Sequence, residues 1–164
     1  MSEAEHLDLQ SACDQLIASH KTLLLATHSV DDGANHISYA PYVRDGNIFY
    51  IFVSELAKHT KNLMSHPQVS ILFIQAESDA DNLFARQRVT LDCQVEEIQK
   101  AIPLYDHQLN VMTEKFGNII HVLRTLPDFH LLALTPKNGQ FVAGFGKAIP
   151  LDAKCRLQWS SSTD

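Results

Sequence analysis

The stretch RVTLDCQVEEI, residues 88–98, constrains the fold more than any other part of the chain. Apolar and polar side chains alternate along it with a period of two: Val89, Leu91, Cys93 and Val95 fall on one side, and Arg88, Thr90, Asp92 and Gln94 on the other. Successive side chains of a β-strand point to opposite faces of a sheet. The pattern therefore predicts a long strand with one buried and one exposed face.

Further stretches have the composition of strands and are separated by turn residues. They lie at 22–27, 36–43, 48–53, 68–74, 128–135 and 140–149. Asp45-Gly46 and Asn138-Gly139 are typical hairpin turns, so we expect 128–135 and 140–149 to form a closing hairpin. Strands linked by such short connections form an antiparallel sheet, and a sheet of about seven strands removes its edges most easily by curling into a barrel.

Helical periodicity is confined to a few segments. Apolar residues recur at helical spacing from Leu9 to Ile17 and again from Leu109 to Leu123, and a short helix is expected within 54–66. The sequence thus predicts a mainly β (α+β) fold in which helices flank the barrel. Its length of 164 residues suits one domain, which we place at 1–150, with 151–164 as a loose C-terminal tail.

Composition excludes several classes of function. The formal net charge of −6 argues against general binding to nucleic acid or to an anionic membrane, since both need a basic surface. The apolar runs are too short to span a bilayer, and the N-terminus lacks the features of a signal peptide. Three cysteines without CxxC spacing suit reduced thiols, so we expect a cytoplasmic protein. The nine histidines show no metal-ligand spacing, and no metal site is predicted.

Anion-seeking side chains gather on the short helix after the third predicted strand. Lys58, His59 and Asn62 lie there, and Ser54 suits a helix start whose backbone N–H groups could hold an anion. Arg88 lies on the polar face of the long alternating strand. Together these groups could bind an acidic cofactor through a phosphate or a pair of carboxylates. The alternative is that residues 58–62 are simply a solvated helix face.

Motifs in a fixed order give the chain a family resemblance. SYAPYV (38–43), KNLMSHPQVSI (61–71) and FARQRVT (84–90) occur within a similarity that runs from about residue 15 to about residue 150. In these motifs the chain resembles the HugZ/HutZ haem-utilisation proteins, which belong to the pyridoxamine-5′-phosphate-oxidase-like split-barrel group. The resemblance implies a homodimer of split β-barrels that binds its ligand between subunits.

The resemblance also implies roles for particular residues. Flavin enzymes of the group hold the FMN phosphate with an Arg-Lys pair, which falls here on Lys58 and His59, so the flavin pattern is eroded. The functional positions of the haem-utilising branch fall on Thr22, His59, Arg88 and Asp128. Arg88 and His59 would lie near the haem edge or propionates, Asp128 would orient an axial histidine across the dimer interface, and Thr22 would tune that interface.

One feature departs from the family. Its haem-utilising members carry an axial histidine in a GHR-like stretch near the C-terminus, whereas here no histidine follows His130. The tail could be altered or truncated, the iron could be ligated differently, or haem binding could be lost. Three functions stay open: a haem-degrading, haem-oxygenase-like enzyme supplied by an electron donor, an FMN-dependent oxidoreductase, and a non-catalytic haem carrier.

Overall fold

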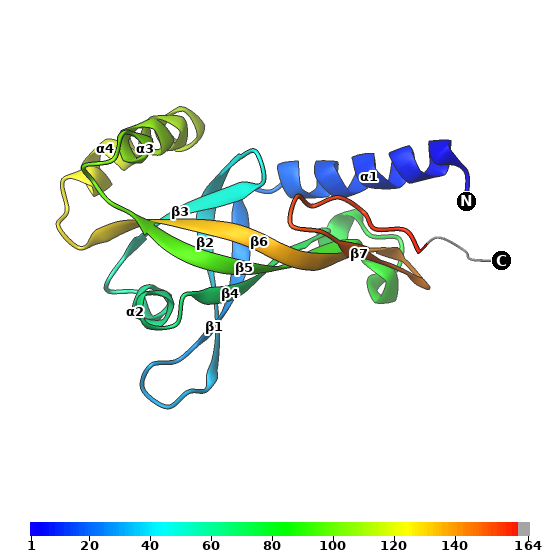
Figure 1. Ribbon diagram of the computed structural model, residues 1–164, viewed down its shortest axis with the longest axis horizontal. Coiled ribbons are helices and arrows are strands. Elements are labelled where there is room, and N and C mark those ends of the chain that lie inside the picture. Colours follow the sequence, from blue (N-terminus) through cyan, green and yellow to red (C-terminus); the bar gives the residue numbers. More distant parts are fainter. Residues whose placement is uncertain (161–164) are drawn as a thin grey trace.

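A computed structural model describes residues 1–160 of the chain. Figure 1 shows a twisted sheet with α3 and α4 at one end of the molecule and both termini at the other. The strands are β1 (Thr22–His28), β2 (Asn35–Asp45), β3 (Ile48–Ser54), β4 (Gln68–Ile74), β5 (Arg88–Ile98), β6 (Phe129–Gly144) and β7 (Lys147–Leu151). The helices are α1 (Glu3–Ala18), α2 (Lys58–Ser65), α3 (Pro103–Phe116) and α4 (Ile119–Arg124), with short 3-10 turns at Glu77–Asp79 and Leu83–Ala85.

The strands form a closed antiparallel barrel. Their order is β3-β2-β1-β4-β5-β6-β7, and an additional β3–β6 pairing joins the first strand to the sixth. Strands β1 to β6 therefore close on themselves, while β7 extends the sheet from β6. Closure removes the open edges on which sheets aggregate. The predicted mainly β fold with flanking helices is confirmed.

Strand alternation produces the barrel core. Along β5 the residues Val89, Leu91, Cys93 and Val95 are buried, and the residues between them face outward. Phe49, Phe73 and Phe141, from three other strands, are fully buried in the same core, and α1 adds Cys13 and Ile17. The interior is thus filled by side chains rather than empty. Arg88 accordingly lies on the outer side of β5.

A second, smaller core lies outside the barrel. Helices α3 and α4 pack their buried Leu109, Met112 and Ile120 against Phe52 and Leu131, which lie on β3 and β6. The sequence predicted one long helix here. The structure breaks it at Gly117, whose φ of 85° is a conformation that favours glycine.

The closing hairpin differs from the prediction. Residues 129–144 form one strand, β6, which ends at Gly144; the turn that follows contains Gly146, and both glycines have positive φ. The Asn138-Gly139 pair lies instead beside a shift in register between β5 and β6, at Asp92/Cys93. Glycine is common both in β-bulges and in turns, so the Asn138-Gly139 pair alone could not distinguish the two structures.

Residues 151–157 are packed, contrary to the predicted loose tail. Leu151 ends β7 and forms an isolated bridge with Leu157, while Cys155 and Leu157 are buried against the barrel core. Gln10 of α1 holds this segment by donating to the Cys155 carbonyl and accepting from the Leu157 N–H. The expectation for 161–164 lies outside the described residues. Among residues 1–160, no helix combines the length and apolarity that a membrane crossing requires.

Candidate functional site

Helix α2 begins three residues later than the sequence suggested. Its N-cap is Ala57, which offers no side-chain cap, and its first turn carries no acidic residue. Ser54 therefore does not cap the helix but ends β3, where its hydroxyl accepts a hydrogen bond from the Leu56 N–H. An uncapped helix start with lysines nearby remains suited to an anion.

His59 is buried, with 8% of its surface exposed. Its Nδ1 lies 2.8 Å from the Ser38 hydroxyl, and the hydrogen bonds within residues 1–160 leave its Nε2 without a partner. Burial, and next the neighbouring His36, lowers its pKa, so the ring is neutral at pH 7. A neutral imidazole that is held at one nitrogen can use the other as a ligand or hydrogen-bonding group.

Asn62 fixes the helix against the barrel. Its Nδ2 donates to the Thr27 hydroxyl at 3.0 Å, and its Oδ1 accepts from the Val30 N–H at 3.1 Å. The side chain is buried, and both ends of its amide are hydrogen-bonded within the chain. This geometry gives Asn62 a structural task at the predicted site.

Lys58 and Lys61 border a small cavity of about 200 Å³. Asn62 and Glu55 lie in its wall together with the turn after β1. The volume is below the range of about 300–1,000 Å³ typical of small-molecule pockets. Two carboxylates, Asp31 and Glu55, face the two lysines there, and the cavity is too small for a porphyrin or a flavin ring.

Asp128 lies beside Ser54. The Ser54 hydroxyl donates to the Asp128 carboxylate at 2.5 Å, and the Glu55 N–H donates to the Asp128 carbonyl at 2.9 Å. Thr60 of α2 also donates to the Ser54 carbonyl. Ser54 and Asp128 therefore belong to the same end of the barrel as α2.

Sequence reasoning missed His130. Its Nδ1 lies 2.6 Å from Glu97 and its Nε2 2.8 Å from Glu55. Hydrogen bonding to Glu97, opposed by partial burial and helped by Glu55, raises the pKa of this imidazole. The three side chains come from β5, β6 and the loop after β3, so no spacing in the sequence could have revealed the cluster.

Thr22 and Arg88 lie at the opposite end of the sheet. Thr22 begins β1, whereas Asn62 anchors α2 near the end of β1, and seven residues of strand span roughly 20 Å. Because Leu24 pairs with Leu72, and Ile74 with Arg88, the start of β1 and the start of β5 share an end. In a single chain the predicted site residues therefore form two separate groups, one at Thr22 and Arg88 and the other around α2.

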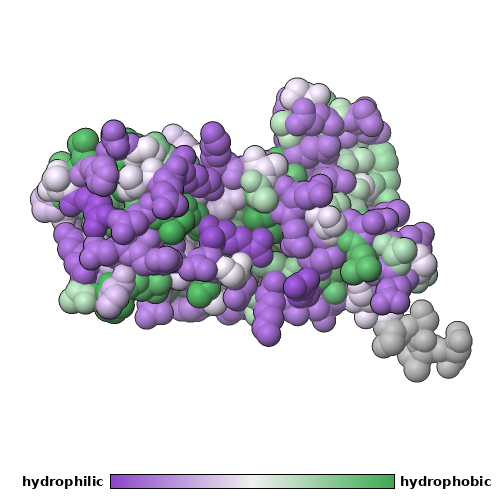
Figure 2. All heavy atoms as spheres, turned by 90° about the horizontal axis from the view of Figure 1, so that it is seen from above, coloured by the Kyte–Doolittle hydropathy of each residue, from purple (hydrophilic) through white to green (hydrophobic). Residues whose placement is uncertain are grey.

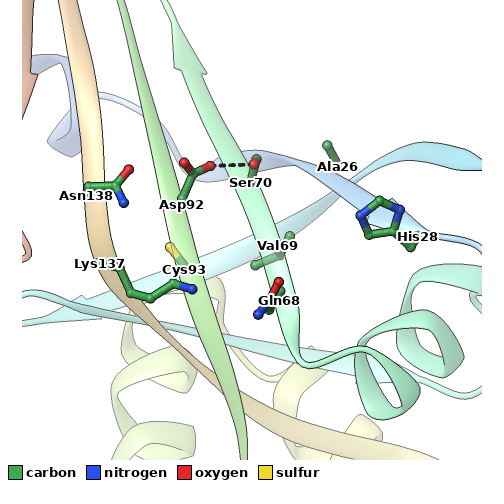
Figure 3. Close-up of a pocket in the computed structure, with 9 residues that line it drawn as sticks. All are labelled: Ala26, His28, Gln68, Val69, Ser70, Asp92, Cys93, Lys137 and Asn138. Carbon is green, nitrogen blue, oxygen red and sulfur yellow. Dashed lines mark hydrogen bonds between the residues drawn. The ribbon is translucent and has the colours of Figure 1, made fainter.

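A further hollow of about 260 Å³ lies across β1, β4, β5 and β6 on the outer face of the barrel. Figure 3 shows Asp92 accepting a hydrogen bond from Ser70 there, with Lys137 and Asn138 from the β6 bulge nearby. None of the predicted site residues lines it. No group of three or more His, Cys, Asp or Glu side chains within residues 1–160 could hold a metal ion.

The chain thus forms a closed antiparallel barrel with a short helix between its third and fourth strands. The chain belongs to the pyridoxamine 5′-phosphate oxidase family, whose model matches residues 9–143, and within it to the HutZ-like group. The resemblance found in the sequence motifs is confirmed.

Relatives in two bacteria support this placement. The chain is 41% identical to the haem oxygenase HutZ of Vibrio cholerae serotype O1 over 128 residues, and these make up 78% of this chain and 72% of that protein. A crystal structure of HutZ from Vibrio cholerae, described as a haem storage protein, matches with a TM-score of 0.75 and 35% identity, over 83% of this chain and 94% of that one. Campylobacter jejuni ChuZ matches with a TM-score of 0.81 and 27% identity, over 92% of this chain and 61% of that one.

Proposed function

We propose that the protein binds haem between two copies of itself and degrades it during haem iron utilisation. The observation that carries this proposal is the 41% identity to the haem oxygenase HutZ over most of the chain. The residues at the α2 end of the barrel suit the ligand, because Lys58 and Lys61 can pair with haem carboxylates. His59 supplies a neutral ring nitrogen either to the iron or to a propionate.

A second copy is needed to complete the site. The cavities beside Lys58 and on the outer sheet face, at about 200 and 260 Å³, are too small to enclose a porphyrin. The outer faces of β1 and β2 expose Ile37, Tyr39 and Leu24, with 76%, 62% and 38% of their surfaces accessible. Leu24 and Tyr39 are cross-strand partners, so these side chains form one apolar surface suited to a homodimer.

Two-fold symmetry explains why the predicted residues lie in two groups. If two copies pack antiparallel along β1, the Thr22 and Arg88 end of one chain meets the α2 end of the other. Arg88 then reaches the haem edge from one subunit while Lys58 and His59 reach it from the partner. Asp128, held by Ser54, faces the same interface and orients the group that ligates the iron, and Thr22 sets the packing of the two chains.

Bound haem supplies the iron and the porphyrin ring for the oxygen chemistry, so it is both cofactor and substrate. The protein contributes cationic clamps, a neutral imidazole and a carboxylate that fixes orientation. Electrons come from a separate donor. The three cysteines are free and buried, which suits a reducing compartment and a cytoplasmic location.

Two other functions have specific support. The description of HutZ as a storage protein favours a haem carrier that performs no degradation. Membership of the pyridoxamine 5′-phosphate oxidase family favours FMN, whose phosphate would lie at the uncapped start of α2 between Lys58 and Lys61. The eroded Arg-Lys pair makes FMN the weaker choice.

Spectroscopy with haemin tests the proposal. Haemin should give a Soret band that saturates at one haem per chain, and the band should disappear when ascorbate and oxygen are added. A stable band under reductant would indicate the carrier, and a yellow protein with flavin absorption would indicate FMN. Protein that binds neither ligand would refute all three functions. A changed spin state in His59→Ala would place His59 on the iron, whereas a change in affinity alone would place it at a propionate.

A further inference from the structure

A cationic cavity lies at the opposite end of β3 from Ser54. It has a volume of about 420 Å³ and lies between the β2–β3 hairpin, α1 and the packed segment 152–158. Its wall includes Arg44, Lys154 and Arg156, together with the single carboxylate of Asp14. None of the residues assigned to haem lines it.

Its three cations have no ion-pair partner among the residues that the structure describes. Among residues 1–160, neither Arg44, Lys154 nor Arg156 lies within salt-bridge distance of a carboxylate. Three positive charges and one negative charge leave the wall with a surplus of two positive charges, in a chain whose formal net charge is −6. Like charges held around one cavity repel one another unless an anion lies between them.

Arg44 is held in place on the hairpin side. Its Nε donates to the Gly46 carbonyl at 2.9 Å, and its guanidinium carbon lies 5.2 Å from the centre of the Phe49 ring. These contacts occupy one edge and one face of the guanidinium group. Within residues 1–160 no hydrogen bond occupies either terminal nitrogen, so both suit a bidentate interaction with an oxyanion.

The opposite wall is fixed by Asp152. Its carboxylate accepts hydrogen bonds from the backbone N–H groups of Lys154 and Arg156 at 2.8 and 2.9 Å. Cys155 between them is buried and has a φ of 59°, so the two cationic side chains flank an anchored residue. Asn47 joins the two walls by donating to the Ala153 carbonyl at 3.1 Å.

We infer that this cavity binds a small molecule through a phosphate or polyphosphate group. The surplus of positive charge favours a ligand with two or more negative charges over a single carboxylate. Two arginines and one lysine supply the forked and point-charge donors that phosphate oxygens accept. Because the backbone of both walls is anchored, the cavity keeps its shape when no ligand is bound.

Titration of pyrophosphate into the full chain tests the inference. We expect saturable binding by calorimetry, together with shifts of the Lys154 and Arg156 amide signals in ¹⁵N-edited NMR spectra. Lys154→Gln and Arg156→Gln should each weaken binding by about tenfold or more, as expected for a lost charge-assisted hydrogen bond. Lys147→Gln removes the same charge from an exposed position on β7 and should change affinity little.

The controls separate this cavity from the haem site. Lys58→Gln should leave pyrophosphate binding intact, and the two cavity variants should keep wild-type haemin binding. The inference is overturned if pyrophosphate does not bind, if Lys58→Gln removes its binding, or if Lys154→Gln and Arg156→Gln bind it as the wild type does. If a variant fails to fold, the shifts in the wild-type spectrum decide, because signals confined to other residues would also overturn it.

Discussion

Mixing two defective variants tests whether each haem site is built from two chains. Arg88→Ala removes a cation beside the start of β1, and His59→Ala removes the imidazole on α2, the helix that Asn62 anchors near the end of β1. Each pure variant then carries one defect in every site. In a mixed dimer, one site contains both defects and the other contains neither.

The expected recovery follows from random pairing. Half of the dimers are mixed and each has one intact site, so about a quarter of all sites should regain wild-type affinity. Arg88→Ala alone should weaken haemin binding by about 1.5–3 kcal/mol, the usual effect of losing a charge-assisted hydrogen bond. The two chains can be co-expressed with different tags, purified together and titrated with haemin at a concentration that only intact sites bind.

A mixture that binds as the average of its parents would refute the shared site. The arrangement would also fail if the protein stayed monomeric at the concentrations used. Co-expression of two copies of Arg88→Ala with different tags is the matched control, because it passes through the same purification but contains no intact site.

Other expectations concern stability. Gly139→Ala should lower the free energy of unfolding by about 1–3 kcal/mol in urea titrations, because the added Cβ would overlap the Thr90 carbonyl, whereas unchanged stability would show that the bulge can relax. Asp128→Asn should lower the free energy of unfolding by about 1 kcal/mol in the same assay, because it weakens the charge-assisted hydrogen bond from Ser54. The cost should be much smaller in a Ser54→Ala background, where that bond is already absent, and equal costs would mean that the two side chains are not coupled. The pKa of His130 is raised above the usual histidine value of 6.5, so the protonated imidazole stabilises the fold. The free energy of unfolding should therefore fall as the pH rises from 6.5 through the raised pKa, and His130→Gln should flatten this dependence. The same slope in both proteins would exclude the mechanism.

The fold was largely predictable because it rests on local patterns. The period-two alternation of residues 88–98 correctly identified β5, and a set of short connections correctly indicated an antiparallel barrel. Errors arose where one residue type serves two structures. Asn138-Gly139 lies beside a bulge within β6 rather than in a turn, and Gly117 ends a helix inside a continuous apolar pattern.

The candidate site was only partly predictable, for a different reason. Lys58, His59 and Asn62 lie on one helix, so their proximity follows from spacing. The Ser54–Asp128 and His130–Glu97 contacts join residues that are 74 and 33 positions apart, and only the pairing of strands brings them together. The packing of 152–157 depends on Gln10, which the composition of the tail does not reveal.

Barrel closure has a consequence for how the chain is made. Strand β3 pairs with β6 through contacts such as Phe49 with Leu134, so its partner is synthesised long after β3 itself. While translation is still short of residue 129, the nascent chain presents β3 and β5 as two open edges. Ribosome pausing or premature release in that interval would leave a fragment prone to aggregation, and chaperone demand should peak there.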